Sequence, residues 1–403
     1  MIGFETDNLN DCLVFDTRAQ VQGYLDRIAN IDKWLQPFVN EMSVGAIPTE
    51  IQLFMEPELK YEFGGFEKKI LVDPDDERVR KCIEDAHGIF LMLPDPSLRG
   101  LGIRAYPTHP MCYRTLLRRG GEECAIMINW KARKGVTPLA VTEKMDRLSF
   151  SFSHFSLGAK VLIRDGVCMV ARSSDYAILP CGELVYEVED VLQQEYPGYE
   201  FVRGSASDEF LVLEYYLNED LIEEKIREII DPGSDKRLRA GIRFSTSDVG
   251  SAAACVKPFY LYDNKVFIVG SGSAQPLYMS HTGDASVSKF RDKLDGVGSI
   301  FKDNEEVLEK LYLEKISSVR TVLEKVLEAY SGSFPKAQAD AVASETDAGP
   351  GTAVDVYIAL CDIAERAGRK AGPDRHLSLC DLVERLTRLP FDKIDKGEKW
   401  DKV

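Results

Sequence analysis

Histidine is scarce in this chain of 403 residues, and its five histidines lie far apart. Metal-dependent hydrolases place histidines at fixed spacings such as HExxH, because a metal ion needs several ligands at once. No such spacing occurs here, and no His/Cys pair lies at ligand spacing. The acidic runs at 73–76 and 223–224 fall at predicted helix starts or on solvated helix faces, where acids are common. We therefore expect no metal and no cofactor, and we assign no catalytic residue.

Paired cysteines are also absent. The nine cysteines are odd in number, scattered singly, and never form a CxxC motif. This pattern argues against a disulfide framework or a zinc site, and it indicates reduced, mostly buried thiols in a cytoplasmic protein.

The chain has no long apolar run, and its first residues carry acids where a signal peptide needs Lys or Arg. We expect a soluble cytoplasmic protein without a membrane partner. Basic residues are in deficit: 50 Lys and Arg against 66 Asp and Glu give a net charge of −16. Such a charge repels polyphosphates and anionic membranes at long range, so any contact with nucleic acid must be local.

The strand pattern predicts largely antiparallel pairing. A hairpin is expected around 164–166, since Asp-Gly supplies the positive φ of a tight turn. A second hairpin is expected from Arg239 to Gly270, its arms joined through PFYLYDN. Further strands are predicted at 51–56, 66–72, 88–94, 199–204 and 209–217.

Apolar residues at steps of three and four predict the helices. The clearest is one long helix from about 303 to Tyr330. The others are predicted at 17–44 (one helix or a pair), 73–86, 183–196, 220–230, 352–368 and 377–389. Strands in runs with flanking helices predict the α+β class: a mixed, largely antiparallel central domain with a C-terminal helical pair.

The same patterns predict four parts. We expect an N-terminal α/β region with a basic segment over 1–150 and a central α+β domain over 151–330. A linker follows over 331–352, where large apolar side chains are rare, and 353–403 forms a helical cap.

The candidate site is indicated by the distribution of charged residues along the chain. Between Leu98 and Lys134 eight basic residues face only Glu122 and Glu123, which makes this segment about +6. Cations with interleaved aromatic rings are typical of single-stranded nucleic-acid sites, where the cations bind phosphates and the rings stack on bases. The candidate residues, called here the basic segment, are Arg99, Arg104, Tyr113, Arg114, Arg118, Arg119, Trp130, Lys131, Arg133 and Lys134.

Two other interpretations of these residues stay open. The rings of Tyr113 and Trp130 can belong to the core, with the cations paired to this chain's many carboxylates. Conversely, Lys236, Arg237, Arg239 and Arg243 can extend the basic stripe. The glycine-rich VGSGS at 269–273 lacks a phosphate-binding pattern and is predicted to be a plain turn.

Three segments resemble a known family. VCMVARSSDYAILPCGELVYEVEDVL is similar to a strand-to-helix step of the phage/plasmid-like proteins of unknown function. Ser245, Ser247, Asp248, Val249 and Gly250 resemble its Ser-x-Ser-Glu-Val-Gly hairpin, with Asp in place of Glu. Thr352, Ala353, Tyr357 and Ala359 resemble its Thr-Ala helix, so the likeness spans about 105–367. It implies a gene carried by phages, prophages or plasmids, hence a bacterial host cytoplasm, and no established chemistry.

Three functional hypotheses follow. The first is a non-catalytic mobile-element protein that binds or anneals single-stranded DNA through the basic segment, as a homo-oligomer that multiplies weak phosphate contacts. The second is an acidic interaction protein that inhibits a host defence protein. The third is an enzyme with a dispersed site, for which Asp175, Tyr176, Ser247 and Asp248 are the residues to substitute.

Overall fold

The structure is a computed structural model that describes residues 12–47, 49–55, 57–63, 66–95, 102–122, 138–269 and 277–403. The chain divides into two compact units. Unit 1 comprises Met1–Leu25 and Ala177–Val403, and unit 2 comprises Asp26–Tyr176. This division differs from the predicted four parts, because the N-terminal strand joins the sheet formed by the C-terminal half and the C-terminal helices pack on that sheet.

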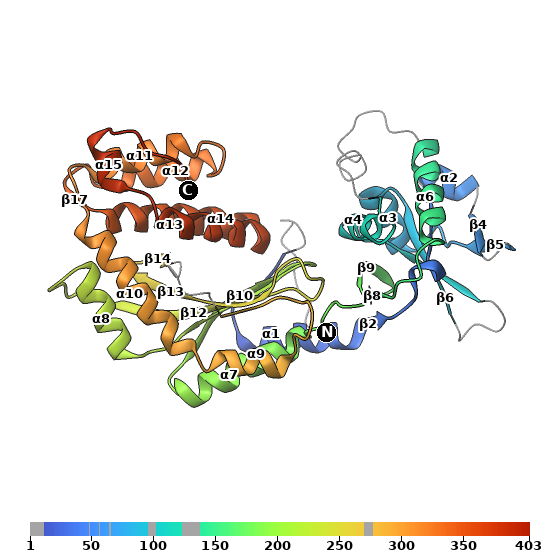
Figure 1. Cartoon of the computed structure of the whole chain (residues 1–403), viewed down its shortest axis with the longest axis horizontal. Helices are drawn as coiled ribbons and strands as arrows, with labels where there is room; N and C mark the ends of the chain where they lie inside the picture. The colour runs from blue at the N-terminus through green and yellow to red at the C-terminus, as the bar shows by residue number, and fades with distance from the viewer. Residues whose placement is uncertain are drawn as a thin grey trace. The chain divides into compact units, whose positions relative to one another are not determined.

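Unit 1 is built on a curled antiparallel sheet of seven strands (Figure 1). Its strand order is β1-β10-β11-β12-β13-β14, and β15 also pairs with β13. The strands are β1 (Leu13–Phe15), β10 (Glu200–Ala206), β11 (Leu211–Tyr216), β12 (Leu238–Thr246), β13 (Ala254–Tyr262), β14 (Lys265–Ile268) and β15 (Leu277–Met279).

The predicted second hairpin is wrong in its pairing. Its two arms, β12 and β14, are not partners, because the segment expected to connect them forms the long strand β13 between them. The turn that joins β13 to β14 is only two residues long, and Asp263 and Asn264 both adopt positive φ there. Asp and Asn tolerate this left-handed conformation better than other side chains do.

Helices cover both faces of this sheet (Figure 1). On one face lie α13 (Ala353–Ala371) and α14 (Pro373–Leu386), and on the other lie α7 (Cys181–Glu195) and α9 (Val287–Leu294). Alternate residues of one strand therefore meet different helices. Phe244 of β12 packs on Phe290 of α9, whereas its neighbour Arg243 bonds Glu365 of α13. Both faces of the sheet are consequently buried.

The predicted long helix is two helices. α10 (Val297–Leu313) ends before the short strand β16 (Lys315–Ile316), which pairs with β17 (Gly351–Thr352). α11 (Val319–Ala329) then begins after Ser318, whose hydroxyl caps it by accepting from the Thr321 amide. A serine at this position favours a new helix start over continuation, since its oxygen satisfies a free backbone amide.

The predicted linker is also wrong over Lys336–Glu345, because these residues form α12. Ala339, Val342 and Ala343 are buried there, so small apolar residues suffice to hold this helix. The expected C-terminal helical pair is confirmed as α13 and α14, and α8 (Asp220–Ile230) has the predicted bounds. A short helix α15 (Phe391–Lys396) follows the pair.

Unit 2 contains two three-stranded antiparallel sheets and a separate hairpin. The sheets have the orders β2-β8-β9 and β3-β6-β7, and the hairpin pairs β4 with β5. The strands are β2 (Asp32–Leu35), β3 (Ser43–Ala46), β4 (Glu58–Phe63), β5 (Phe66–Leu71), β6 (Ile89–Pro94), β7 (Ile103–Pro107), β8 (Ala159–Arg164) and β9 (Val167–Ser173). The predicted turn between β8 and β9 is confirmed, with positive φ at Asp165 and Gly166.

The core of unit 2 lies between its sheets and helices. Leu116, Leu148 and Val161 share one apolar cluster, so two helices and a sheet pack together. The helices with the adjoining 3-10 turn are α1 (Arg18–Ile31, shared with unit 1), η1 (Val39–Glu41), α2 (Glu50–Met55), α3 (Glu77–Ala86), α4 (Pro110–Arg119) and α6 (Pro138–Phe152). The strand predicted at 51–56 is therefore wrong, and the helix predicted over 17–44 ends at residue 31, where β2 begins.

The α+β class is confirmed by this arrangement of antiparallel strands with flanking helices. Among the described residues, no helix combines the length and apolar character needed to cross a bilayer.

Gly241 tests the tight packing of the unit 1 sheet. A Cβ added there would lie 2.5 Å from the carbonyl oxygen of Tyr215 and 2.7 Å from the Phe259 ring. Gly241→Ala should therefore lower the free energy of unfolding by about 1–3 kcal/mol in urea titrations. The matched control is Gly23→Ala in α1, where an added Cβ meets nothing within 4 Å. It should stabilise by about 0.5–1 kcal/mol, and equal effects of the two variants would contradict the described packing.

Candidate functional site

The basic segment falls in unit 2, and the structure describes half of its predicted residues. The described members are Arg104, Tyr113, Arg114, Arg118 and Arg119. The predictions for Arg99, Trp130, Lys131, Arg133 and Lys134 lie outside the described residues.

Helix α4 carries four of the described members and has two distinct faces. Tyr113 is buried at 7% exposure, in one apolar cluster with Leu116 and Leu117. Its ring therefore cannot stack on a base, which corrects its predicted binding role and agrees with the alternative that it belongs to the core. Arg114 and Arg118 lie one turn apart and are exposed.

The other two described cations are less exposed or paired with an acid. Arg104 donates from Nε to Asp95 at 2.7 Å, with half of its side chain exposed. Arg119 is only partly exposed, and burial lowers its pKa against the attraction of Asp175. Arg114 and Arg118 are thus the cations of α4 that face solvent.

The proposed extension of the stripe is wrong for Arg243, and for Lys236, Arg237 and Arg239 it stays a prediction. Lys236, Arg239 and Arg243 belong to unit 1, and each has an acidic partner there. Lys236 pairs with Asp263 at 2.9 Å, and Arg239 pairs with Glu200 at 2.8 Å. Arg243 is 3% exposed and cannot reach a ligand on the surface.

The residues named for a dispersed enzyme site divide between the two units, and three of them have local structural contacts. Tyr176 of unit 2 stacks on Trp34 with ring centres 5.6 Å apart. In unit 1, Asp248 accepts from the Cys181 amide at the start of α7, and Ser247 accepts from the Ser251 amide. Asp175 of unit 2 is not buried.

The most unusual feature of the structure is a row of charged side chains across the unit 1 sheet. Four adjacent strands each contribute one residue, and each residue is the direct cross-strand partner of the next. The residues are Arg203 of β10, Glu214 of β11, Arg243 of β12 and Lys257 of β13. Glu214 accepts from Arg203 Nε at 2.6 Å and from Arg243 Nε at 2.7 Å. Glu214 and Arg243, in the middle of this charged row, are buried beneath α13 and α14, whereas the side chains of Arg203 and Lys257 at its ends are 24% exposed. An unpaired charge at the buried positions would be very costly.

Those two helices supply the compensating charges. Glu365 of α13 accepts from Arg243 at 2.6 Å and from Arg203 at 3.1 Å. Lys257 donates to Asp381 and Glu384 of α14, at 2.8 Å each. The helices therefore dock where the acids and the strand cations meet, which fixes their position on the sheet.

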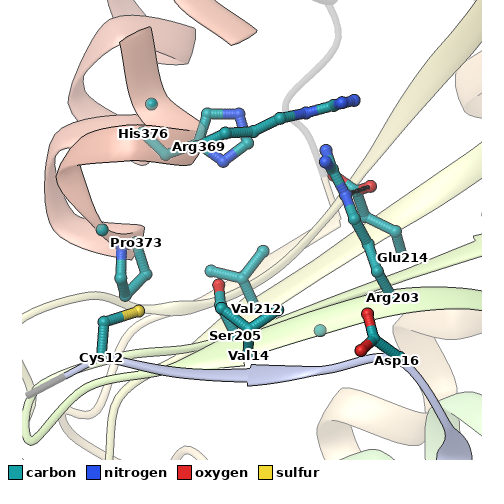
Figure 2. Close-up of a pocket in the computed structure, with 13 residues that line it drawn as sticks. Cys12, Val14, Asp16, Arg203, Ser205, Val212, Glu214, Arg369, Pro373 and His376 are labelled. Carbon is teal, nitrogen blue, oxygen red and sulfur yellow. Dashed lines mark hydrogen bonds and ion pairs between the residues drawn. The ribbon is translucent and has the colours of Figure 1, made fainter. Parts of the chain in front are cut away.

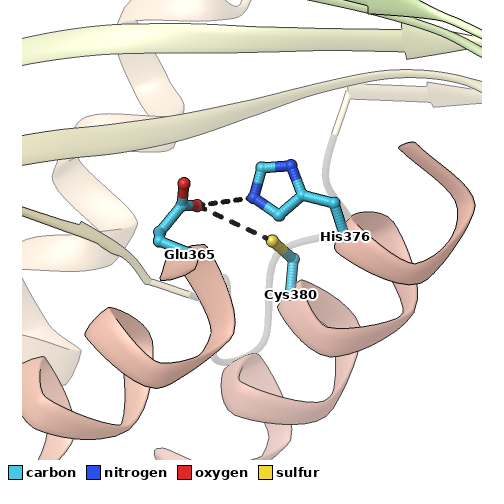
Figure 3. A group of neighbouring side chains, drawn as sticks. All are labelled: Glu365, His376 and Cys380. Carbon is cyan, nitrogen blue, oxygen red and sulfur yellow. Dashed lines mark hydrogen bonds and ion pairs between the residues drawn. The ribbon is translucent and has the colours of Figure 1, made fainter. Parts of the chain in front are cut away.

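Glu365 also joins His376 and Cys380 of α14 (Figure 3). His376 Nε2 lies 2.8 Å from a Glu365 oxygen, and Arg243 Nη1 donates to the Cys380 sulfur at 2.8 Å. Burial opposes the charge of His376, but Cys380 and Glu365 outweigh it and raise its pKa to about 9. Burial likewise opposes ionised Glu365, yet Arg243 and His376 hold its pKa well below the usual range.

Glu365, His376 and Cys380 are a donor set that a metal ion such as zinc can use. The expectation that no His/Cys pair lies at ligand spacing is therefore wrong, because His376 and Cys380 stand four residues apart on α14. The chemistry around them does not fit a cation, however. The guanidinium of Arg243 already donates to both the carboxylate and the sulfur, and a protonated His376 offers no lone pair. We therefore interpret this cluster as an ionic network centred on Arg243.

A pocket of about 280 Å³ opens beside the network (Figure 2). Strands β1, β10 and β11 form one wall, and the α13–α14 junction forms the other. Arg203, Glu214 and His376 of the network line it, with Arg369, Asp16 and Cys12 nearer its opening. Buried polar groups that converge on a cavity are typical of binding sites.

Sequence analysis missed the network, although the strands contain a sign of it. Glu214 stands alone in LVLEYY, and Lys257 stands alone in ACVKPFYLY. A single charge inside an apolar strand suggests a buried partner. Which partner it meets depends on strand order and helix docking, neither of which is local in sequence.

In comparisons with protein-family models, with curated proteins and with solved structures, the chain matches none. The resemblance to phage/plasmid-like proteins therefore stays a prediction.

Arg243 tests the energetic role of the network. Arg243→Met removes the cation shared by Glu214 and Glu365, whose side chains are 4% and 6% exposed. The free energy of unfolding should fall by about 3–5 kcal/mol, because two buried carboxylates are left with Arg203 as their shared arginine. Lys236→Met breaks the half-exposed pair with Asp263 and should cost under about 1 kcal/mol. Equal losses in urea unfolding would contradict a structural network.

His376 should make the stability of unit 1 depend on pH. Its raised pKa means that the protonated form stabilises the fold fully below the ordinary pKa of 6.5, and that this contribution is lost as pH rises through about 9. The loss should be on the order of 3 kcal/mol. His376→Gln should flatten the stability change between pH 6.5 and 9 in urea titrations. His154→Gln, at an exposed histidine of unit 2, should keep the wild-type profile.

Proposed function

We propose that this protein binds single-stranded nucleic acid without catalysing a reaction, through the exposed face of α4 in unit 2. The observation that supports the proposal is the division of that helix. Its apolar face is buried in the core of unit 2, and its opposite face presents Arg114 and Arg118 to solvent. Guanidinium groups match phosphate oxygens in geometry and charge, so this face suits a phosphate backbone.

The distribution of charge between the units supports the same surface. Residues 26–176 contain 21 Lys and Arg and 21 Asp and Glu, so unit 2 has no net charge. The whole formal charge of −16 belongs to unit 1. Unit 2 is therefore the part of the chain whose own charge least opposes a polyanion.

The buried position of Tyr113 changes the expected mode of binding. Without its ring as a stacking platform, the described part of the site offers contacts to phosphates and none to bases. Binding should thus be independent of nucleotide sequence, and its affinity should depend strongly on the salt concentration. Two arginines per chain make a weak site, so we further propose that binding occurs as a homo-oligomer, which multiplies such contacts. The resemblance to phage- and plasmid-borne proteins is consistent with this role.

Fluorescence anisotropy with a labelled single-stranded 20-mer tests the proposal. The wild-type protein should bind at low salt and lose affinity as salt rises. Arg114→Ala/Arg118→Ala should weaken binding by about tenfold at low salt and reduce the slope of log K against log salt by about 1.4, or 0.7 per phosphate lost.

The control for loss of positive charge is Arg27→Ala, at an exposed position of α1. It removes one positive charge from another helix, half of the change in the double variant, and should bind as the wild type does. Absence of binding by the wild type at 20 mM salt would refute the proposal. So would an equal loss of affinity in the control and the double variant, since that would indicate a general charge effect.

A further inference from the structure

Two buried cysteines of unit 2 are in contact with each other. Cys112 lies in the first turn of α4, and Cys168, 56 residues later, lies in β9. Both are 0% exposed, and their sulfur atoms are 3.3 Å apart. A disulfide bond is about 2.0 Å long, so bonding requires an approach of about 1.3 Å, which rotation of two side chains can supply. Two cysteines that are distant in the sequence are thus neighbours in space.

Hydrogen bonds hold α4 against β9 on both sides of this cysteine pair. The amide of His109, at the start of α4, donates to the carbonyl oxygen of Cys168 at 2.9 Å. Three residues beyond Cys112, the hydroxyl oxygen of Thr115 accepts from the Ala171 amide of β9 at 3.0 Å. The two sulfurs therefore meet because the backbones that carry them are fixed to each other.

The pair is buried, but it lies just beneath the surface. Pro110 is exposed, and Met111 and Val167, each next to one of the cysteines, are partly exposed. Helix ends open more readily than helix centres, so opening of the first turn of α4 would bring the sulfurs within reach of a small oxidant. Burial and the neighbouring Cys112 hold the pKa of Cys168 well above its usual range, which slows its reaction. Oxidation should therefore be slow and limited by local opening.

We propose that Cys112 and Cys168 are a redox-sensitive pair that forms a disulfide in the presence of hydrogen peroxide. One thiol, once deprotonated, attacks a peroxide oxygen; the O–O bond breaks, hydroxide leaves, and the sulfur becomes a sulfenic acid. The second sulfur, also deprotonated, attacks the first, so that the S–S bond forms while the S–O bond breaks and a second hydroxide leaves. The two thiol protons convert the hydroxides to water. Two thiols are thereby oxidised and one peroxide is reduced to two water molecules.

The disulfide would fasten α4 to β9. A cross-link between distant residues stabilises a fold mainly by restricting the unfolded chain. The first turn of α4, through which the oxidant enters, would be closed by the product of the reaction. The helix that presents Arg114 and Arg118 would then remain on its sheet under oxidising conditions. This inference does not rest on nucleic-acid binding, because the bond fixes the helix whatever the helix binds.

Peptide mapping of the full chain tests the proposal directly. The protein is incubated with millimolar hydrogen peroxide, quenched in acid, alkylated and digested with trypsin without reduction. Trypsin releases the two cysteines in separate peptides, 105–114 and 165–172, each with a single cysteine. Mass spectrometry should find these two peptides joined, with the loss of two hydrogens. Their absence as a joined pair after a day would overturn the proposal, whether the thiols stay reduced, oxidise to sulfinic acid or join other cysteines.

Hydrogen exchange of the α4 peptides tests the structural consequence. Peroxide treatment of the wild-type protein should slow their exchange by about tenfold or more, because the cross-link opposes opening of the helix. Dithiothreitol should restore the original rate, which separates a disulfide from oxidised methionine, since dithiothreitol does not reverse the latter. Equal exchange before and after treatment would overturn the proposal.

Two cysteine variants of unit 2 are matched for this measurement. Cys168→Ala removes one partner of the pair, so peroxide should no longer slow exchange in α4. Cys82→Ala removes another buried thiol, at 4% exposure on α3, and should respond to peroxide as the wild type does. The same response in both variants would show that the pair is not responsible and would overturn the proposal. Peptide mapping of the wild type decides the question even where a variant fails to fold.

Discussion

The charged row across β10, β11, β12 and β13 is the constraint on which unit 1 depends. Arginine, glutamate, arginine and lysine lie side by side on four adjacent strands, on a sheet face that is covered by two helices. Buried charges are tolerated only when each meets an opposite charge in good geometry. Glu365 of α13 and Glu384 of α14 meet this requirement, so the two helices have one favourable position on the sheet. An apolar face of the same size would hold them less specifically.

The same constraint shapes the pocket. The row ends at Arg203, next to the short edge strand β1, where the helices no longer cover the sheet completely. The cations there are held by the network and still reach a cavity. A side chain that is fixed by several partners loses little freedom on binding, which is why preorganised charges make effective binding sites. The same few residues therefore hold the helices and line the pocket, whereas the arginines of α4 belong to another unit and to the exposed face of their helix.

The spacing of apolar residues and the turn residues predicted an element correctly wherever that element depends mainly on its own residues. The bounds of α8 and the Asp165-Gly166 turn follow from helical spacing and from the conformational tolerance of glycine. The same patterns gave wrong predictions where an element depends on strands or helices that are distant in the sequence. The interval from α10 to α11 has continuous helical spacing, yet β16 interrupts it because β17 pairs with it some 35 residues later. Residues 331–352 contain few large apolar side chains, yet α12 forms there because α11 and α13 give its alanines a surface to pack on.

The sequence by itself determined the α+β class, several strands, the two C-terminal helices and the basic character of the segment that contains α4, since these depend on periodicity and composition. Only the tertiary structure decided that Tyr113 is buried while Arg114 faces solvent, because consecutive helical residues point about 100° apart and packing decides which direction is the core. It alone also brought Glu214, Glu365 and His376 together from positions up to 162 residues apart. Burial turns ordinary charged residues into a network and a pocket, and burial is a property of the folded chain.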